Sequence, residues 1–281
     1  MAFNGRSSDG QGQKERRMRR NLMLALALAG VLSLGVAAIA SAVQTTLRAG
    51  NLVITFGGST SPSKLPKNDY VPIATNFFGK ISTSDGTHPS ALREVQFDVD
   101  KDVKINVKGF PACKTGELTA RDTKAAMKVC GDSKLGSGIA HIEVAFPEQK
   151  PILVTSPITV FNGGEKGGKV KLLIHVFLTV PVPAAIVTDV TVTRKGTGFS
   201  SVAKIPVAAG GSGSAIDFKF TVGKTYTYKG KKVGYAEARC PDGVFKANVK
   251  KVLFKNEAKI PGVAAQTVLK GGLAVPCTPK G

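Results

Sequence analysis

The histidines are the first candidates for catalysis, because imidazole titrates near neutral pH and serves as a general base. His175 lies within an apolar run between Ile174 and Val176, which indicates a hydrogen-bonded core residue. His88 lies in a polar loop in which Asp85 is available to pair with it, but no matched nucleophile follows. A small hydrolase that uses His88 or His175 is therefore the third of three hypotheses, and we expect a protein that is not an enzyme.

Three short motifs are similar to those of the penicillin-recognising serine enzymes. They are S-x-x-K at Ser61–Lys64, a near match to S-D-N at Ser84–Gly86, and K-T-G at Lys114–Gly116. In that chemistry the serine and the lysine share one face at the start of a buried helix. Here both lie in a polar loop flanked by proline, so we do not expect this activity.

The acids of Asp98-Val99-Asp100-Lys101-Asp102 alternate like the opening of a calcium-binding loop. Val103 stands where that loop needs glycine, and Gly109 stands where it needs glutamate. The same acids are explained without a metal as one face of a hairpin. A calcium site of another geometry remains an alternative. The sequence has no zinc-type spacing, phosphate loop or nucleophile elbow, and we expect no cofactor and no metal.

The segment from residue 226 to residue 235 gathers aromatic and cationic side chains in one hairpin. Tyr226 and Tyr228 share a face of the strand, and Tyr235 follows on the return. Their rings, beside lysine ammonium groups, would form a flat platform for sugar rings or an anionic polymer. The alternative is ordinary packing of tyrosines at a sheet margin. The candidate ligand platform comprises Tyr226, Tyr228, Tyr235, Lys229, Lys231 and Lys232.

All four cysteines lie after residue 42, and an even number outside the cytoplasm favours two disulfides. Of the three ways to pair them, Cys113 with Cys130 and Cys240 with Cys277 give the shortest closures, and we favour that pattern. Each disulfide would stabilise the fold by about 3 to 4 kcal/mol, because it constrains the unfolded chain.

Runs of Val, Ile, Thr and Phe, separated by Gly, Pro and Asn, are typical of strands after residue 42. Residues 95–107 alternate apolar and polar and predict a hairpin that turns at Asp100–Asp102. Leu172–Val187 predicts a strand buried on both faces, a turn at Pro181–Pro183 and a second strand. Thr119–Asp122 fits a capping box and predicts one short helix of about 10 residues. About a dozen strands indicate an all-β fold, a two-layer antiparallel sandwich of the jelly-roll kind with one short helix.

Residues 1–42 are typical of an export signal. The first twenty residues hold six basic and two acidic side chains, and the apolar run Leu22–Ala42 follows without a charge. Ala40 and Ala42 give the A-x-A spacing that a signal peptidase cleaves, before Val43. The alternative is an uncleaved signal-anchor helix, because about 20 apolar residues can cross a bilayer. Sec and twin-arginine routes both stay open, since arginine pairs occur in either signal.

Both alternatives place residues 43–281 outside the cytoplasm, because the basic residues before the apolar run stay on the cytoplasmic side. We expect one disulfide-stapled domain there, either secreted or anchored on the outer face of the cytoplasmic membrane. This part holds 33 of the 39 basic and 17 of the 19 acidic side chains, a formal net charge of +16. Such a charge attracts anionic envelope polymers, glycans or lipid headgroups, whereas export removes the chain from nucleic acid. The alternative is that the lysines only keep strand edges soluble.

Two cysteine-containing stretches resemble uncharacterised exported β-sandwich proteins of high-GC Gram-positive bacteria. They are Phe110-Pro111-Ala112-Cys113 with Cys130 and Gly136-Ser137-Gly138 after it, and Arg239-Cys240-Pro241-Asp242-Gly243. The resemblance implies a secreted sandwich with paired cysteines and supplies no activity. The first hypothesis is therefore a non-enzymatic envelope or extracellular protein, structural or adhesive at anionic surfaces. A carbohydrate-binding module that uses the tyrosine platform is the second.

Overall fold

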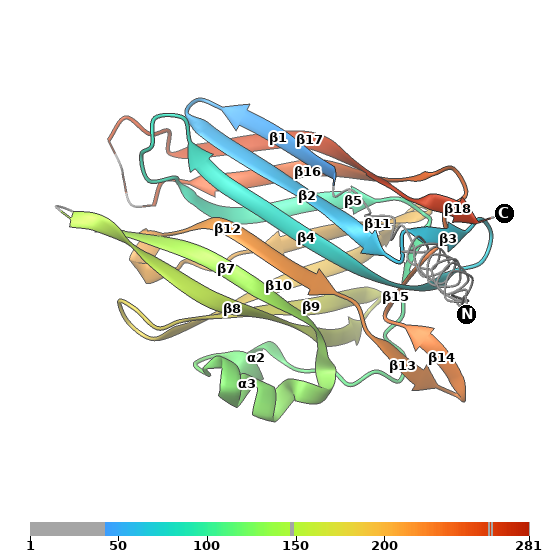
Figure 1. Cartoon of the computed structure of the whole chain (residues 1–281). Coiled ribbons are helices and arrows are strands. Elements are labelled where there is room, and N and C mark those ends of the chain that lie inside the picture. The colour runs from blue at the N-terminus through green and yellow to red at the C-terminus, as the bar shows by residue number, and fades with distance from the viewer. Residues whose placement is uncertain (1–42, 147–148, 258, 260, 281) are drawn as a thin grey trace, which may run out of the picture. The chain divides into compact units, whose positions relative to one another are not determined.

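The computed structural model of the chain describes residues 43–146, 149–257, 259 and 261–280. The predicted export segment, with its cleavage site at Ala40 and Ala42, lies outside them. The described part consists of strands, two short α-helices and two 3-10 turns (Figure 1). The strands are β1 (Val43–Ala49), β2 (Leu52–Ser61), β3 (Lys64–Pro66), β4 (Val71–Thr83), β5 (Ala91–Val99), β6 (Val103–Ile105), β7 (Lys134–Phe146), β8 (Gln149–Lys166), β9 (Lys169–Leu178), β10 (Ala184–Lys195), β11 (Gly198–Lys204), β12 (Gly213–Val222), β13 (Thr225–Tyr228), β14 (Lys231–Gly234), β15 (Ala236–Ala238), β16 (Val244–Lys255), β17 (Gln266–Pro276) and β18 (Thr278–Lys280). The helices are α2 (Thr115–Leu118) and α3 (Thr123–Cys130), and the 3-10 turns are η1 (Gly131–Ser133) and η2 (Ala209–Gly211).

One antiparallel sheet of 14 strands holds most of these elements. Its main order is β1-β2-β4-β12-β7-β8-β9-β10-β11-β5-β16-β17, and β15 and β6 extend it from β4. The five strands from β7 to β11 follow one another as neighbours, as short hairpin connections require. Two strands are inserted from elsewhere in the chain: β12 lies between β4 and β7, and β5 lies between β11 and β16.

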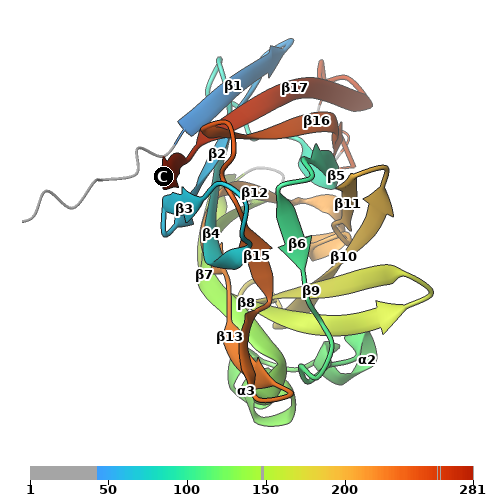
Figure 2. The same ribbon diagram turned by 90° about the vertical axis from the view of Figure 1, so that its right-hand side faces the viewer.

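The two outer strands of this order, β1 and β17, lie beside each other, so the sheet nearly closes on itself (Figures 1 and 2). The Thr45 hydroxyl donates a hydrogen bond of 2.9 Å to the carbonyl oxygen of Gly272. A Cβ atom at Gly271 would lie 2.8 Å from Cδ2 of Leu47, so glycine there lets β1 approach closely.

The prediction of an all-β fold is confirmed. Opposing parts of the single sheet face each other across the interior, where the Ile54 and Ile81 side chains of β2 and β4 cluster with Phe254 of β16. A second apolar cluster fills the space between β7, β8, β9 and β12, with Val144, Val160 and Leu178 at most 1% exposed. The predicted layers are thus connected by hydrogen bonds into one sheet.

The predicted strands around Leu172–Val187 are confirmed as β9 and β10, with the turn at Pro181–Pro183. The outward side chains of β9, including Leu173, are covered by α2 and α3, while Ile174 and Val176 pack inside. This explains why β9 is apolar at nearly every position.

The predicted helix is present, but it begins three residues later than expected. Asp122 is its N-cap, and its carboxylate accepts a 2.7 Å hydrogen bond from the Ala125 amide. Thr119 instead ends the single turn of α2, and Ala120 adopts a left-handed conformation (φ 59°) that separates the two helices.

The predicted hairpin at residues 95–107 is wrong in its pairing. The turn at Asp100–Asp102 is present, but β6 pairs with β15, whereas β5 pairs with β11 and β16. Alternation within a strand specifies which side chains face the core, but it does not specify the partner strand.

The strands run between two ends of the domain, and β18, the last described strand, pairs with β3 at one of them. Val43 lies midway between the ends, because its partner Gly58 pairs with Phe77 in the middle of β4. The thirteen residues of β4 cross the domain from Val71, which pairs with Ala238, to Thr83, which pairs with Leu52. At the rise of an extended strand that length is about 40 Å. No helix among the described residues is long and apolar enough to cross a membrane.

Candidate functional site

The end of the domain that carries β18 is built from short strands that are hydrogen-bonded to one another. β18 pairs in parallel with β3, and the Thr278 amide donates a 2.8 Å hydrogen bond to the Ser63 carbonyl oxygen. The Cys240 amide donates a 2.8 Å hydrogen bond to the carbonyl oxygen of Pro66. β15 bridges β4 and β6. The Cys240–Cys277 disulfide, with 6.1 Å between its Cα atoms, joins this region to the end of β17.

A cluster of charged and aromatic side chains lies beside this disulfide. The buried carboxylate of Asp102 accepts a 2.7 Å hydrogen bond from Nε of Arg239, which raises the pKa of that guanidinium. Nζ of Lys104 lies 3.5 Å from the ring centroid of Tyr70, and the guanidinium carbon of Arg239 lies 5.1 Å from it. The Tyr70 ring is thus in contact with two cations, and cation–π attraction holds both in place.

The hairpin of β13 and β14 is the part of this end that the sequence predicted as a ligand platform. Its turn is Lys229–Gly230, both with positive φ, as a two-residue hairpin turn requires. The Tyr226 hydroxyl donates to the Lys108 carbonyl oxygen at 3.0 Å, and its ring packs on Phe110 at 4.9 Å between centroids. The Tyr228 ring covers Gly109, where a Cβ atom would lie 2.2 Å from its Cδ2. Both rings are therefore used to fasten the hairpin to residues 106–110.

The prediction that Tyr235 belongs to an exposed platform is wrong. Its side chain is 1% exposed and lies in the apolar core, 5.9 Å from Phe110 between ring centroids. Burial raises the pKa of its hydroxyl, which lies 3.4 Å from Oδ1 of Asn162. Two of the three tyrosines are half-buried and the third is enclosed, so the hairpin offers no flat aromatic face of the kind that stacks on sugars.

The lysines of this hairpin do reach solvent, and they belong to a larger set. We define the basic end as residues 64–70, 100–108, 224–242 and 276–280. Ten lysines in these segments are exposed, against two exposed carboxylates, those of Asp69 and Asp242. The exposed lysines are Lys64, Lys67, Lys101, Lys104, Lys108, Lys224, Lys229, Lys231, Lys232 and Lys280. Contacts already described connect all four segments, so the lysines extend over one continuous region.

The opposite end of the domain carries an apolar surface, although Lys255 and Glu257 line a small hollow beside residues 88–91 there. We define the apolar end as residues 84–90, 179–184 and 205–211, which contain no lysine or arginine. A hollow of about 280 Å³ opens there, and its lining is Phe146, Leu178, Pro181, Val182, Ala184, Ala209 and Gly210. Val182 is 69% and Val207 58% exposed beside it. This lining offers no charged group for catalysis or for binding an ion.

His88 belongs to the apolar end, but Asp85 is not its partner. Nδ1 of His88 lies 2.9 Å from Oε2 of Glu143, and the imidazole is 8% exposed. Asp85 instead accepts hydrogen bonds from Asn51 and Thr87, which lower the pKa of its carboxyl. The hollow beside His88 is too tight for a water molecule. A hydrolase needs a base that faces a substrate pocket, and His88 does not have one.

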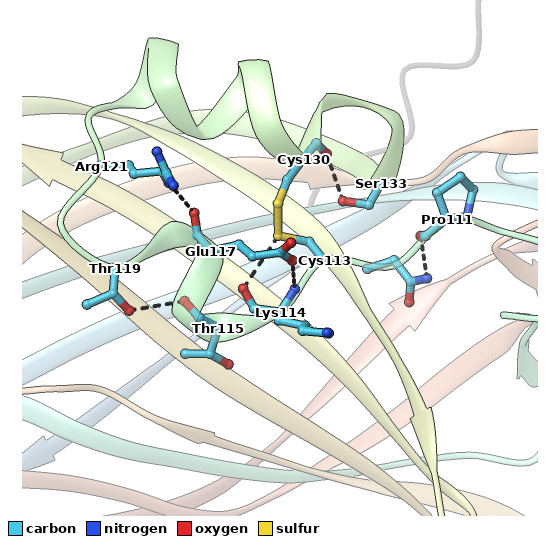
Figure 3. Close-up of a disulfide and its surroundings, with 10 residues drawn as sticks. Pro111, Cys113, Lys114, Thr115, Glu117, Thr119, Arg121, Cys130 and Ser133 are labelled. Atoms are coloured by element: carbon cyan, nitrogen blue, oxygen red, sulfur yellow. Dashed lines mark hydrogen bonds between the residues drawn. A yellow bond between two sulfur atoms is a disulfide. The ribbon is translucent and has the colours of Figure 1, made fainter.

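His175 is fully buried beneath α2 and α3, as the sequence indicated. Its Nε2 donates a 2.9 Å hydrogen bond to the Arg121 carbonyl oxygen, and burial lowers the pKa of the ring. The Cys113–Cys130 disulfide closes the segment above it, and Ser133 donates to the Cys130 carbonyl oxygen at 2.7 Å (Figure 3). His175 therefore fastens a stapled segment to the sheet.

The remaining motifs are not brought together. Lys64 lies at the basic end, with Ser61 just before it at the end of β2, whereas Ser84 lies at the apolar end on the opposite side of the domain. The alternating acids face cations instead of one another: Asp98 contacts Lys195 at 3.0 Å, and Asp102 contacts Arg239. In the described part of the chain, one group has the spacing of metal ligands, Cys113, Glu117 and Cys130. Its two sulfurs are bonded to each other in the disulfide.

No family model, no curated protein and no solved structure matches this chain. The basic end is therefore the candidate functional site on the strength of its own chemistry. Sequence reasoning found its hairpin lysines and both cysteines, but it missed Tyr70, Lys104 and Arg239. Their spacing along the chain carries no signal, because the contact depends on the unforeseen pairing of β6 with β15.

Proposed function

We propose that this chain is an exported, non-enzymatic protein that adheres to anionic surfaces through its basic end. The observation that carries the proposal is the local excess of positive charge: the basic end has ten exposed lysines against two exposed carboxylates. Each lysine near an anionic surface contributes roughly 1 kcal/mol of attraction. Ten dispersed lysines would give solubility alone, whereas ten on one end give an oriented field.

Three further features support it. All four cysteines are in disulfides, as an oxidising compartment outside the cytoplasm favours. The Cys240–Cys277 disulfide crosslinks the basic end and so constrains the backbone that carries its lysines. The cations Lys104 and Arg239 are ordered by Tyr70. The partner class is an anionic envelope polymer, an anionic glycan or a lipid headgroup.

Retention of the full-length protein on phosphocellulose tests the proposal. The protein is purified in a non-ionic detergent, and the salt concentration that elutes it is measured. In one variant Lys224, Lys231 and Lys232 are all replaced by glutamine. In the matched control Lys124, Lys255 and Lys270, which are exposed and lie outside the basic end, are replaced in the same way.

We expect the basic-end variant to elute at a clearly lower salt concentration than the control, although both lose three charges. The reason is that attraction depends on charges that approach the surface within a Debye length of about 8 to 10 Å. Equal shifts for the two variants would contradict the proposal, because retention would then depend on total charge and not on an oriented end.

A further inference from the structure

The three histidines of the chain differ in what their Nδ1 atoms contact. Nδ1 of His88 lies 2.9 Å from Oε2 of Glu143. Nδ1 of His141 lies 2.6 Å from Oδ1 of Asp217. Nδ1 of His175 is buried and has no hydrogen-bond partner among the described residues. A protonated imidazole carries a positive charge and two N–H donors, so protonation of His175 in place would bury an N–H group without an acceptor.

The neutral form of His175 holds the segment that contains α2 and α3 against the sheet. The Arg121 carbonyl oxygen can only accept a hydrogen bond, so the proton of the neutral ring is on Nε2. The ring is 0% exposed, and burial is the largest cause that lowers its pKa. The hydrogen bond to Arg121 and the carboxylate of Asp122 act in the opposite direction, but the net change of the pKa is downward. The docked segment thus disfavours a second proton on the ring.

The elements packed against this ring supply one carboxylate that acts on it, that of Asp122, and its attraction does not outweigh burial. The register partners of His175, Thr159 on β8 and Val187 on β10, are uncharged. Lys171 of β9 and Asp189 of β10 form an ion pair with each other at 2.7 Å. The other charged side chains of the covering segment are Lys114, Glu117, Arg121, Lys124, Lys128 and Asp132.

The covering segment is a separate layer on the outside of the sheet. α2 has four residues and α3 has eight, and helices this short are not stable without tertiary packing. Leu118 and Ala126 supply that packing, because both are 0% exposed and cluster with Phe161 of β8. The Cys113–Cys130 disulfide joins the two ends of the segment, so a segment that left the sheet would remain attached as a closed loop.

We infer that residues 114–129 form a flap that acid releases from the outer face of β8 and β9, and that His175 is the group whose protonation releases it. In the released state the imidazole reaches water, where its pKa returns to the ordinary value of about 6.5. Because the docked pKa is lower than that, docking is strongest above about pH 6.5 and weakens below it, by up to about tenfold per pH unit. Release exposes Phe161 and Leu173, which are 0% exposed when the flap is docked.

Amide hydrogen exchange of the full-length protein, measured by mass spectrometry on peptic peptides between pH 7.5 and pH 5, tests this inference. Each rate is divided by the intrinsic rate of an unstructured peptide at the same pH. Protection of residues 114–129 should fall by up to about tenfold per pH unit below about pH 6.5, because the short helices melt when the flap is released. Protection of β9 and β10 should stay constant, since their ladder does not depend on the flap.

His175→Gln separates titration from packing. Glutamine keeps an N–H donor for the Arg121 carbonyl oxygen but does not titrate in this range, so the protection of residues 114–129 should become independent of pH. The matched controls are His88→Gln and His141→Gln, which remove an imidazole that faces a carboxylate. Both should retain the pH dependence of the unmodified protein.

Unchanged protection of residues 114–129 at pH 5 in the unmodified protein would overturn the inference. Parallel loss of protection in β9 and β10 would overturn it too, because the whole domain would then be unfolding. A pH dependence that persists in His175→Gln, or that disappears in either control, would assign the release to another group. If His175→Gln does not fold, the ¹⁵N resonances of the His175 ring decide: protonation of the ring while residues 114–129 stay protected contradicts the inference, and loss of protection together with protonation supports it.

Discussion

The two ends of this domain belong to the same sheet, but they differ in covalent crosslinking and in the side chains that they expose. The basic end is covalently stapled by Cys240–Cys277 and built around a small apolar cluster that includes Leu65 and Phe245. The apolar end has no disulfide among its described residues and surrounds a hollow beside Leu178. The basic end thus has a covalent crosslink that the described segments of the apolar end do not have, and this crosslink opposes the mutual repulsion of its lysines.

Of the changes that test this comparison, removal of the basic-end disulfide should have the largest effect on the free energy of unfolding. Replacing Cys240 and Cys277 by alanine should lower the free energy of unfolding by about 4 kcal/mol, because the bridge closes a long loop in the unfolded chain. Replacing Cys113 and Cys130 should cost about 3 kcal/mol, since that loop is shorter. Urea unfolding under non-reducing conditions measures both. A smaller loss for the Cys240–Cys277 pair would contradict the view that the basic end is the covalently held one.

Truncation of one buried leucine at each end gives the next largest effect. Leu65 is 0% exposed within the basic-end cluster, and Leu178 is 1% exposed but lines the hollow. Leu65→Ala should cost about 3 to 4 kcal/mol, and Leu178→Ala about 2 kcal/mol, because a side chain beside a hollow has fewer atoms packed around it. The midpoints of thermal and urea unfolding report the difference. The reverse order would mean that the hollow is closed in solution.

Acidification should loosen the Asp85 turn at the apolar end, and this is the smallest effect. The folded pKa of Asp85 is lowered by its hydrogen bonds from Asn51 and Thr87. Its contribution is therefore complete above the unfolded value of about 3.9 and is lost as the pH falls below it. Lysines keep their charge throughout this range. Because the folded pKa of Asp85 is lowered far below its ordinary value, the Thr87 amide resonance should hold its position as the pH falls through about 3.9 and shift only at more acidic pH, and Asp85→Asn should abolish that shift. A shift that persists in Asp85→Asn would assign the transition to another group.

Local patterns in the sequence predicted the strands of this domain well because side-chain alternation and turn residues are properties of neighbouring positions. β9 and β10, with the turn at Pro181–Pro183, were found in this way. The partner of β6 was not, since nothing in Val103–Ile105 distinguishes β5 from β15 as a neighbour. The near-closure of the sheet was missed for a similar reason, because it depends on β1, which the sequence did not mark as a strand.

The sequence predicted only part of the candidate site, because some of its features depend on local patterns and others on contacts between distant segments. The exposed lysines of the hairpin follow from composition, and the cysteine pairs follow from closure length. The burial of Tyr235 could not be foreseen, because its position just after β14 turns the ring into the core while Tyr226 and Tyr228 remain at the margin. The cluster of Tyr70, Lys104 and Arg239 needs three segments that are far apart in the chain.

Because β1 contacts β17, the domain cannot be completed until nearly all of the chain has been synthesised. β1 is the earliest described strand to leave the ribosome, and its hydrogen-bonded neighbour β2 follows at once, but its other flank is covered only by residues from Gln266 onward. During synthesis and transport, one edge of β1 therefore stays uncovered until nearly the whole polypeptide has arrived. A chain truncated before β17 would keep that edge open, and self-association through it would be the expected failure.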